Sequence, residues 1–284
     1  MSAKVISFIN LKGGVAKTTT TVGTALVLAK HYNKKVLVVD LDPQTNATVM
    51  LIGEEKWKEL DDQEYTISTL FLDMLDSKSN FDLHKTIQKN VGNLKDVSGV
   101  DLIPSSVRLV YLQDELYDVR FKSGPKKNPY MMLDWKIGPV TSLYDYILFD
   151  CPPNLGVLTL NGLQMSQGYV IPAIPDILST YGLNQITNRI DKFAINRNLK
   201  LSLLGLVFTK VKTSSVLHQV QQKTLREQGL FPIFNTVFAE NSKFAEAAEY
   251  TTPMTLNQKW GGGSSKYLTP FVDFCGELIE KVEK

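Results

Sequence analysis

Apolar residues in this chain come in short runs that alternate with amphipathic segments. Residues 5–9 form the first run, rich in β-branched and aromatic side chains, which is typical of a strand buried on both faces. A glycine-rich loop follows, and then a helix is predicted over residues 17–31. Residues 35–42 form another buried strand, which ends in acidic residues. This order of strand, helix and strand predicts a βαβ unit with parallel strands.

The same alternation continues along the chain. Further strands are predicted at residues 100–103, 147–149, 169–174, 201–208 and 231–237. Helices are predicted at residues 66–75, 157–166, 179–195, 214–228, 242–250 and 267–284. We expect one domain over residues 1–284, because there is no internal repeat or long linker. Its fold class is α/β: a doubly wound, mostly parallel sheet with helices on both faces, which binds ligands at the carboxyl ends of its strands.

Two segments interrupt the alternation. Residues 120–129 are polar and basic and contain one glycine and two prolines, which predicts a surface loop. A solvated run of charges with no role explains that segment equally well. Residues 261–263 are three consecutive glycines and predict a flexible joint.

Composition says more about the cellular compartment of the protein than about its function. The 31 basic and 29 acidic residues of the 284-residue chain give a net charge of +2, which by itself indicates no class of partner. Cys151 and Cys275 have no pairing pattern, which favours a reducing compartment. Apolar segments all fall short of the ~18 residues that span a membrane. The N-terminus runs directly into a strand, without room for a signal peptide, so we expect a cytoplasmic protein.

The loop at residues 11–19, LKGGVAKTT, has the features of a phosphate-binding site. Glycines let backbone N–H groups close around an anion, and the helix N-terminus adds partial positive charge. Lys17 is expected to reach the β- and γ-phosphates of a nucleotide, and the Thr18 hydroxyl to hold Mg²⁺. A glycine-rich turn without a ligand is the alternative, and the lysines and threonines argue against it.

Acidic residues at two strand ends complete the predicted site, since metal and water must also be placed. Asp150 follows an apolar strand, where its carboxylate is expected to hold Mg²⁺. Asp40 and Asp42 end the strand at residues 35–42. A carboxylate that only caps the next helix is the alternative for each acid alone. Three acids in these positions favour a metal and nucleotide site.

The phosphate loop departs from the pattern G-x-x-x-x-G-K-[ST], because Leu11 and Ala16 occupy its two glycine positions. It resembles instead the deviant Walker A motif, KGGVGKTT, of the ParA/MinD superfamily of P-loop NTPases. The resemblance implies that Lys12 is the signature lysine, which reaches across a dimer interface to the partner's nucleotide. Ala16 replaces a glycine, and its Cβ is expected to crowd the phosphate or to disfavour a positive φ.

Three further segments carry the same resemblance. Residues 38–44, VVDLDPQ, match the family's second acidic motif, which implies that Asp42 positions the attacking water and that Asp40 lies nearer the metal. Gln44 and Asn46 continue this motif on the phosphate side. Residues 150–156, DCPPNLG, resemble the switch segment DCPPSLG that senses the γ-phosphate, with Cys151 there for packing.

Residues 236–247, TVFAENSKFAEA, resemble the family's TVIPRNVRLSEA, which implies that Asn241 contacts the base. Ala239 and Glu240 replace a proline and an arginine of that motif. The implied catalytic residues are Lys12, Lys17 and Asp42, and the implied metal ligands are Thr18, Asp40 and Asp150. The implied nucleotide-binding residues are Lys12, Gly13, Gly14, Val15, Ala16, Lys17, Thr18, Thr19 and Asn241.

The resemblance is to the small Soj-type ParA proteins, because no N-terminal region for a helix-turn-helix is present. It implies a slow, Mg²⁺-dependent ATPase whose ATP-bound sandwich homodimer binds double-stranded DNA without sequence preference. A ParB-like partner would stimulate hydrolysis and release the dimer from DNA. The cycle would segregate a plasmid or chromosome, so that the protein is nucleoid-associated.

Charge supports DNA binding in part. Residues 192–266 contain ten basic and four acidic residues, a net charge of +6. A basic face doubled by dimerisation would bind phosphates through counterion release. The candidate DNA contacts are Lys210, Lys212, Arg226 and Lys243. An ordinary solvated surface is the alternative, and Glu240, in place of an arginine, favours it.

Three alternatives to DNA partition remain. A MinD-like membrane cycle needs a basic amphipathic C-terminal helix, but residues 266–284 have a net charge of −1 and an acidic polar face, which suits packing onto the domain. A positioner of a non-DNA cargo, such as a protein organelle, would share every site residue. A non-enzymatic scaffold fits least, because the phosphate and metal sets are complete.

Overall fold

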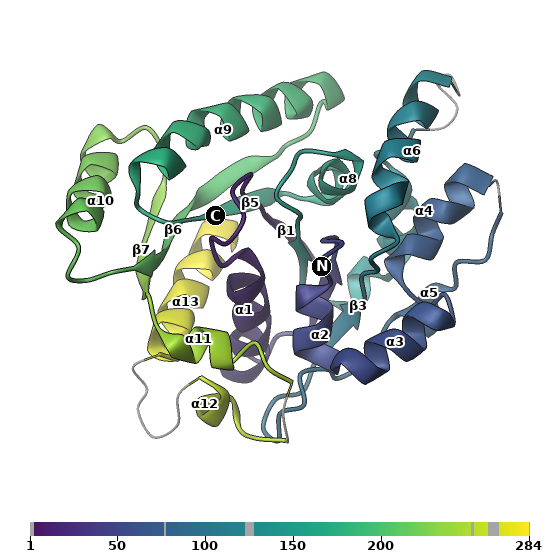
Figure 1. Ribbon diagram of the computed structural model, residues 1–284, viewed down its shortest axis with the longest axis horizontal. Helices are drawn as coiled ribbons and strands as arrows, with labels where there is room; N and C mark the ends of the chain where they lie inside the picture. Colours follow the sequence, from purple (N-terminus) through teal and green to yellow (C-terminus); the bar gives the residue numbers. More distant parts are fainter. Residues whose placement is uncertain (1–2, 77, 123–127, 251–252, 261–266, 284) are drawn as a thin grey trace.

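The computed structural model of the chain describes residues 3–76, 78–122, 128–250, 253–260 and 267–283 (Figure 1). Seven strands among these residues form one sheet in the order β3-β2-β4-β1-β5-β6-β7. All pairings between these neighbouring strands are parallel. The strands are β1 (Lys4–Phe8), β2 (Val36–Asp40), β3 (Val100–Ile103), β4 (Tyr146–Asp150), β5 (Gly168–Ala173), β6 (Ser202–Val211) and β7 (Ile233–Ala239).

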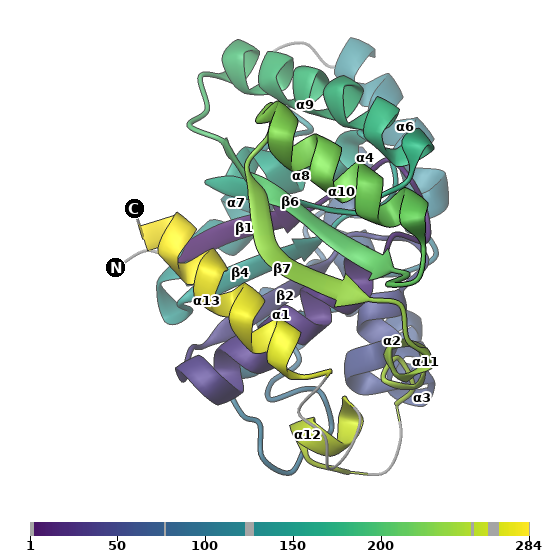
Figure 2. The same ribbon diagram turned by 90° about the vertical axis from the view of Figure 1, so that its left-hand side faces the viewer.

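Helices cover both faces of the sheet. Figure 2 shows α1 and α13 on one face and α8, α9 and α10 on the other. This arrangement confirms the predicted doubly wound α/β fold. The helices are α1 (Lys17–Tyr32), α2 (Asn46–Ile52), α3 (Glu54–Asp62), α4 (Ile67–Asp76), α5 (Leu83–Thr86), α6 (Leu109–Lys122), α7 (Met132–Ile137), the 3-10 helix η2 (Gly138–Leu143), α8 (Val157–Met165), α9 (Ile177–Arg197), α10 (Val216–Gln228), α11 (Ser242–Glu246), α12 (Leu256–Lys259) and α13 (Thr269–Glu283).

The central strands are apolar because both of their faces are buried. Successive side chains of a strand point to opposite faces. In β1, Val5 therefore packs in the core beneath α8 and α9, whereas Ile6 and Phe8 pack beneath α1 and α13. Strands β2 and β4 are buried along their whole length in the same way.

The register of the sheet sets the position of the acidic residues. Phe8, the last residue of β1, pairs with Asp150 of β4, and Asp150 also pairs with Asp40 of β2. The carboxyl ends of three adjacent strands therefore meet at one edge. The glycine loop after β1 and the acids of β2 and β4 lie at this edge.

Helix α13 packs onto the sheet and α1, as its acidic polar face led us to expect. Phe271, Phe274, Cys275 and Leu278 form its buried side. The hydroxyl of Tyr32 in α1 donates a hydrogen bond to the carbonyl of Val272 (2.9 Å). In the described part of the chain, no helix has the length and apolarity needed to cross a membrane.

Several local predictions were wrong. The helix predicted at residues 242–250 ends at Glu246, where the chain turns and the N–H of Glu249 donates to the carbonyl of Glu246 (3.1 Å). Residues 120–122 of the predicted basic loop belong to α6 instead. Residues 123–127 of that loop, and the glycines at 261–263, lie outside the described residues. Helices α2, α3, α5, α6, α7 and α12 and η2 were not predicted as separate elements.

Candidate nucleotide-binding site

The loop between β1 and α1 turns through two residues of positive φ, Gly14 (φ 73°) and Ala16 (φ 61°). The carbonyl of Ala16 accepts hydrogen bonds from the backbone N–H and the hydroxyl of Thr20 (2.9 and 2.7 Å). A Cβ added at Gly13 or Gly14 would meet no atom within 4 Å, so the loop borders open space there. A left-handed conformation costs a non-glycine residue about 1–2 kcal/mol, so Ala16 is strained.

Lys17 points back over this loop. Its Nζ lies 3.3 Å from the carbonyl oxygen of Lys12, and the side chain is almost completely buried. Burial lowers the pKa of the Lys17 ammonium, while the negative charges of Asp150 and Asp42 oppose that shift. A cation held beneath a ring of backbone N–H groups can bind the phosphates of a nucleotide.

Asp40 is completely buried, and both of its carboxylate oxygens accept hydrogen bonds. Oδ1 accepts from the N–H of Asp42 (3.0 Å), and Oδ2 accepts from the N–H and the hydroxyl of Thr48 (2.9 and 2.7 Å). Burial and the neighbouring Asp150 raise the pKa of Asp40 well above its usual value. These contacts give Asp40 a structural task in the loop that carries Asp42.

Asp150 has an oxygen available for a ligand. Its Oδ1 accepts a hydrogen bond from the Thr21 hydroxyl (3.3 Å), whereas its buried Oδ2 has no partner. Burial raises the pKa of Asp150 to about 7. Hydrogen bonds from Thr18 and Thr21 and the positive charge of Lys17 act in the opposite direction and lower this pKa. An unpartnered buried carboxylate oxygen beside a threonine hydroxyl fits Mg²⁺, which prefers oxygen ligands.

No group of three or more histidine, cysteine or acidic residues within the described ranges has the arrangement of a metal site. Mg²⁺ commonly takes only one or two protein ligands and completes its shell with phosphates and water. The pairing of Asp150 with Thr18 fits that mode of binding. Cys151 is fully buried in the core, as expected for a packing role.

A cavity of about 650 Å³ lies beside the glycine loop. Its polar lining includes Asp42, Gln44, Asn46 and Asn241. Of the predicted nucleotide-binding residues in the loop, Gly13, Gly14, Ala16, Lys17, Thr18 and Thr19 also line it. Val15 does not line the cavity: it is buried, and its carbonyl accepts a hydrogen bond from the Thr209 hydroxyl (2.9 Å).

Part of the cavity wall is apolar, which sequence reasoning missed. Phe238, Phe244 and Phe271 line it, together with Met50 and Ala248. These phenylalanines come from β7, α11 and α13, which lie far from the phosphate loop in the sequence. An apolar wall of this kind can accommodate the flat face of a nucleotide base. The motif at residues 236–247 was the available signal, and it predicted Asn241 alone.

Lys12 is turned away from this cavity. Its Nζ lies 2.8 Å from Oδ2 of Asp176, the third residue after β5. The N–H of Lys12 donates to the side-chain oxygen of Asn10 (2.9 Å), and Asn10 Nδ2 in turn donates to the carbonyl of Pro172 (2.8 Å). Lys12 is therefore held near the end of β5 within its own chain.

Three of the four candidate DNA contacts have side chains in the described part of the structure, and each of the three is exposed. Lys210 lines the cavity, and Lys212 Nζ lies 3.5 Å from Oε2 of Glu240. Arg226 donates to the carbonyl of Phe234 (2.8 Å), so its guanidinium is engaged in the fold. Lys243 belongs to α11, and its side chain lies outside the described part of the structure.

Comparison with known proteins adds independent information. The family described as AAA domain matches residues 3–203. The chain is 31% identical to the sporulation initiation inhibitor protein Soj of Bacillus subtilis over 265 residues, which cover 93% of this chain and 95% of that protein. It is also 31% identical to the chromosome-partitioning ATPase Soj of Treponema pallidum over 267 residues, or 93% and 94% of the two chains.

A solved structure with the same fold is cobyrinic acid a,c-diamide synthase from Mycobacterium smegmatis, with bound ADP and magnesium. It superposes with a TM-score of 0.74 at 21% identity, over 99% of this chain and 96% of that chain. At this identity the likeness extends to the fold.

Proposed function

The chain belongs to the AAA-domain family, within its Soj/ParA type, and from this premise we propose that it is a slow, Mg²⁺-dependent ATPase that partitions a plasmid or chromosome. The observation that carries the proposal is the cavity that Lys17 and Asp42 line together with the glycine loop, with the charge of Asp150 acting on Lys17. The partitioning role of the Treponema relative supports the cargo assignment.

The proposed roles combine the motif resemblance with the residues that line the cavity. Lys17 binds the phosphates, the Thr18 hydroxyl and Oδ2 of Asp150 hold Mg²⁺, and Asp42 orients the attacking water at the cavity wall. Mg²⁺ would neutralise charge on the phosphates when bound. Asn241 and the apolar part of the cavity wall receive the base. Asp40 retains its proposed place near the metal, although both of its oxygens already accept hydrogen bonds.

An ATP-dependent homodimer is supported by an exposed apolar patch beside the switch segment. Val107, which precedes α6, and Val110 and Tyr111 in its first turn are 48%, 54% and 76% exposed. Gln113 of the same helix accepts a hydrogen bond from Asn154 of the switch segment (3.2 Å). Large apolar side chains exposed together favour an interaction site. In the proposed dimer, Lys12 leaves Asp176 and reaches the partner's nucleotide.

DNA and a ParB-like activator are the proposed partners of this dimer in the nucleoid. The net charge of +6 over residues 192–266 supports non-specific binding of double-stranded DNA. The ion pair of Lys212 with Glu240 weakens that support and favours the second candidate, a positioner of a non-DNA cargo with the same ATP cycle. A membrane cycle finds no support in α13, whose apolar side is buried in the fold.

The deciding experiment uses Asp42→Ala, which is expected to bind ATP, form a stable dimer and lose turnover. Phosphate release, ATP binding and sedimentation are measured in wild type and variant, with and without random duplex DNA. Full hydrolysis by the variant would refute the role of Asp42. DNA retention that needs ATP and weakens steeply with salt supports partition on DNA, and equal retention without nucleotide opposes it. Proteins that co-purify with the trapped dimer identify the activator and the cargo.

A further inference from the structure

A buried serine in the loop after β3 is bonded to the loop that carries Asp42. The hydroxyl of Ser105 donates a hydrogen bond to the backbone carbonyl of Asp42 (2.7 Å). The backbone N–H of Ser105 donates to the hydroxyl oxygen of Thr48 (2.9 Å). Ser105 and Thr48 are both fully buried, so water does not compete for these bonds.

The bonds form a closed ring. Thr48 donates its hydroxyl to Oδ2 of Asp40 (2.7 Å), and Oδ1 of Asp40 accepts the N–H of Asp42 (3.0 Å). The ring therefore runs through Asp40, Asp42, Ser105 and Thr48 and returns to Asp40. The N–H and the carbonyl of Asp42 are both held by it, and the Asp42 carbonyl also accepts the N–H of Thr45 (2.9 Å). A buried and fully satisfied ring of this kind is rigid.

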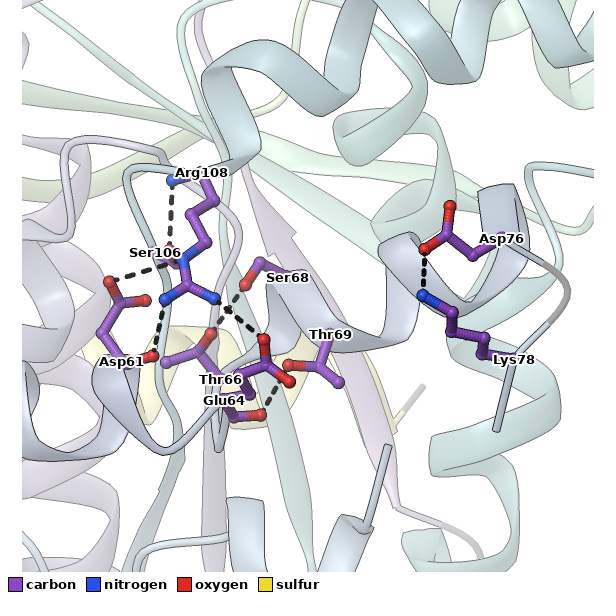
Figure 3. A network of polar contacts seen from close by, with 9 residues as sticks. All are labelled: Asp61, Glu64, Thr66, Ser68, Thr69, Asp76, Lys78, Ser106 and Arg108. Carbon is purple, nitrogen blue, oxygen red and sulfur yellow. Dashed lines mark hydrogen bonds and ion pairs between the residues drawn. The ribbon is translucent and has the colours of Figure 1, made fainter. Parts of the chain in front are cut away.

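The loop after β3, residues 104–108, which contains Ser105, makes further hydrogen bonds outside this ring. Trp57 of α3 donates its indole N–H to the carbonyl of Ser105 (3.1 Å). Figure 3 shows Arg108 reaching toward α3 and the start of α4: its Nη2 donates to the carbonyl of Asp61 (3.0 Å), and its Nη1 lies 3.5 Å from Oε1 of Glu64. Contacts with α3 thus hold the loop of residues 104–108, and Ser105 in this loop is bonded to Asp42.

We propose that Ser105 is a positioning residue for Asp42. Its hydroxyl fixes the main chain of Asp42, and the carboxylate of Asp42 lines the cavity where water must be oriented. A displacement of about 1 Å in a reacting group can slow a reaction roughly 100-fold. The inference rests on the proposed ATPase function, and it gives α3 and the loop after β3 a part in the reaction.

The test compares Ser105→Ala with Ser106→Ala in the full-length protein. Ser106 is the matched control, because it is equally buried but its hydroxyl oxygen accepts the N–H of Arg108 (3.1 Å) and is not bonded to Asp42. We expect Ser105→Ala to lower kcat about tenfold, the effect of one lost hydrogen bond of ~1.4 kcal/mol. The ATP dissociation constant should stay within about twofold. Ser106→Ala should change neither, and Ser105→Thr, which keeps the hydroxyl, should restore kcat.

The outcomes separate this inference from the proposed function. If wild type does not hydrolyse ATP, or Asp42→Ala hydrolyses it fully, the proposed function fails. If both behave as proposed and Ser105→Ala keeps the wild-type kcat, the positioning role is overturned. An equal loss in Ser106→Ala would also overturn it, because general loosening would then explain both.

A second pair of variants covers the case in which Ser105→Ala does not fold, as judged by thermal melting. Thr48→Val preserves the shape of the side chain but removes the hydroxyl that links Ser105 to Asp40. It should lower kcat without weakening ATP binding, and Thr48→Ser should retain activity. A wild-type kcat in Thr48→Val would overturn the proposal.

Discussion

The ammonium group of Lys12 lies 2.8 Å from the carboxylate of Asp176, in an ion pair within one chain. The side chains are 38% and 26% exposed, so the pair is open to solvent and can separate. Separation is required by the proposed dimer, in which Lys12 contacts the partner's nucleotide. Asp176 therefore competes with the dimer for the lysine.

Removal of this competitor is expected to favour dimerisation. Asp176→Asn should lower the dissociation constant of the dimer by up to about fivefold, because an exposed ion pair contributes at most about 1 kcal/mol. Sedimentation with a non-hydrolysable ATP analogue measures the effect. Asp191→Asn, which changes an exposed carboxylate of α9, is the control. A dimer that is unchanged or weaker in Asp176→Asn would contradict the competition.

Loss of the Lys17 ammonium should abolish tight ATP binding. A charged hydrogen bond contributes about 1.5–3 kcal/mol, so we expect Lys17→Ala to weaken binding by roughly 10- to 100-fold. Titration calorimetry provides the measurement. Lys30→Ala is the control, since Lys30 lies on the same helix but pairs with Asp96 (3.4 Å) outside the cavity. Equal affinity in wild type and Lys17→Ala would refute the phosphate-loop assignment.

Backbone strain at Ala16 should be measurable as a lowered free energy of unfolding. Ala16 has φ 61°, which glycine adopts without a Cβ penalty, so Ala16→Gly should raise the free energy of unfolding by about 1 kcal/mol. Urea denaturation tests this. Gly14→Ala is the reciprocal variant: its φ of 73° predicts a similar loss, and an added Cβ there meets no atom within 4 Å. Destabilisation by Ala16→Gly would show that the strain is absent.

Asp150 should make the metal-free protein less stable as the pH rises. Burial raises its pKa from 3.8 to about 7 in the fold, so the folded state holds a proton that the unfolded state releases between these values. The contribution of Asp150 is fully present below about pH 4 and is lost as the pH rises to about 7. The loss is at most about 4 kcal/mol.

The Asp150→Asn variant removes this titration. In EDTA it should be more stable than wild type at pH 8, and the difference should shrink toward pH 5. Urea denaturation at each pH provides the comparison. Added Mg²⁺ with an ATP analogue should stabilise wild type and have little effect on Asp150→Asn. A constant difference across this pH range would mean that Asp150 titrates normally in the fold.

Features that depend on neighbouring residues were predictable from the sequence. Strands β1, β2 and β4 are apolar along their length because both faces are buried, and that composition is visible in a short window. The phosphate loop is equally local, since Lys12 and Lys17 lie five residues apart. Helix α11 was predicted too long: it ends at Glu246, a boundary that the apolar pattern of residues 242–250 does not show.

The sequence by itself determined the parallel α/β fold, the glycine loop and the acids at the strand ends, because strand composition and loop spacing are local properties. Only the tertiary structure decided that Lys12 pairs with Asp176, 164 residues away, and that Ser105 bonds to the carbonyl of Asp42, 63 residues away. It also decided which phenylalanines form the apolar part of the cavity wall. The order of the strands brings these groups together, and no local pattern of side chains encodes that order.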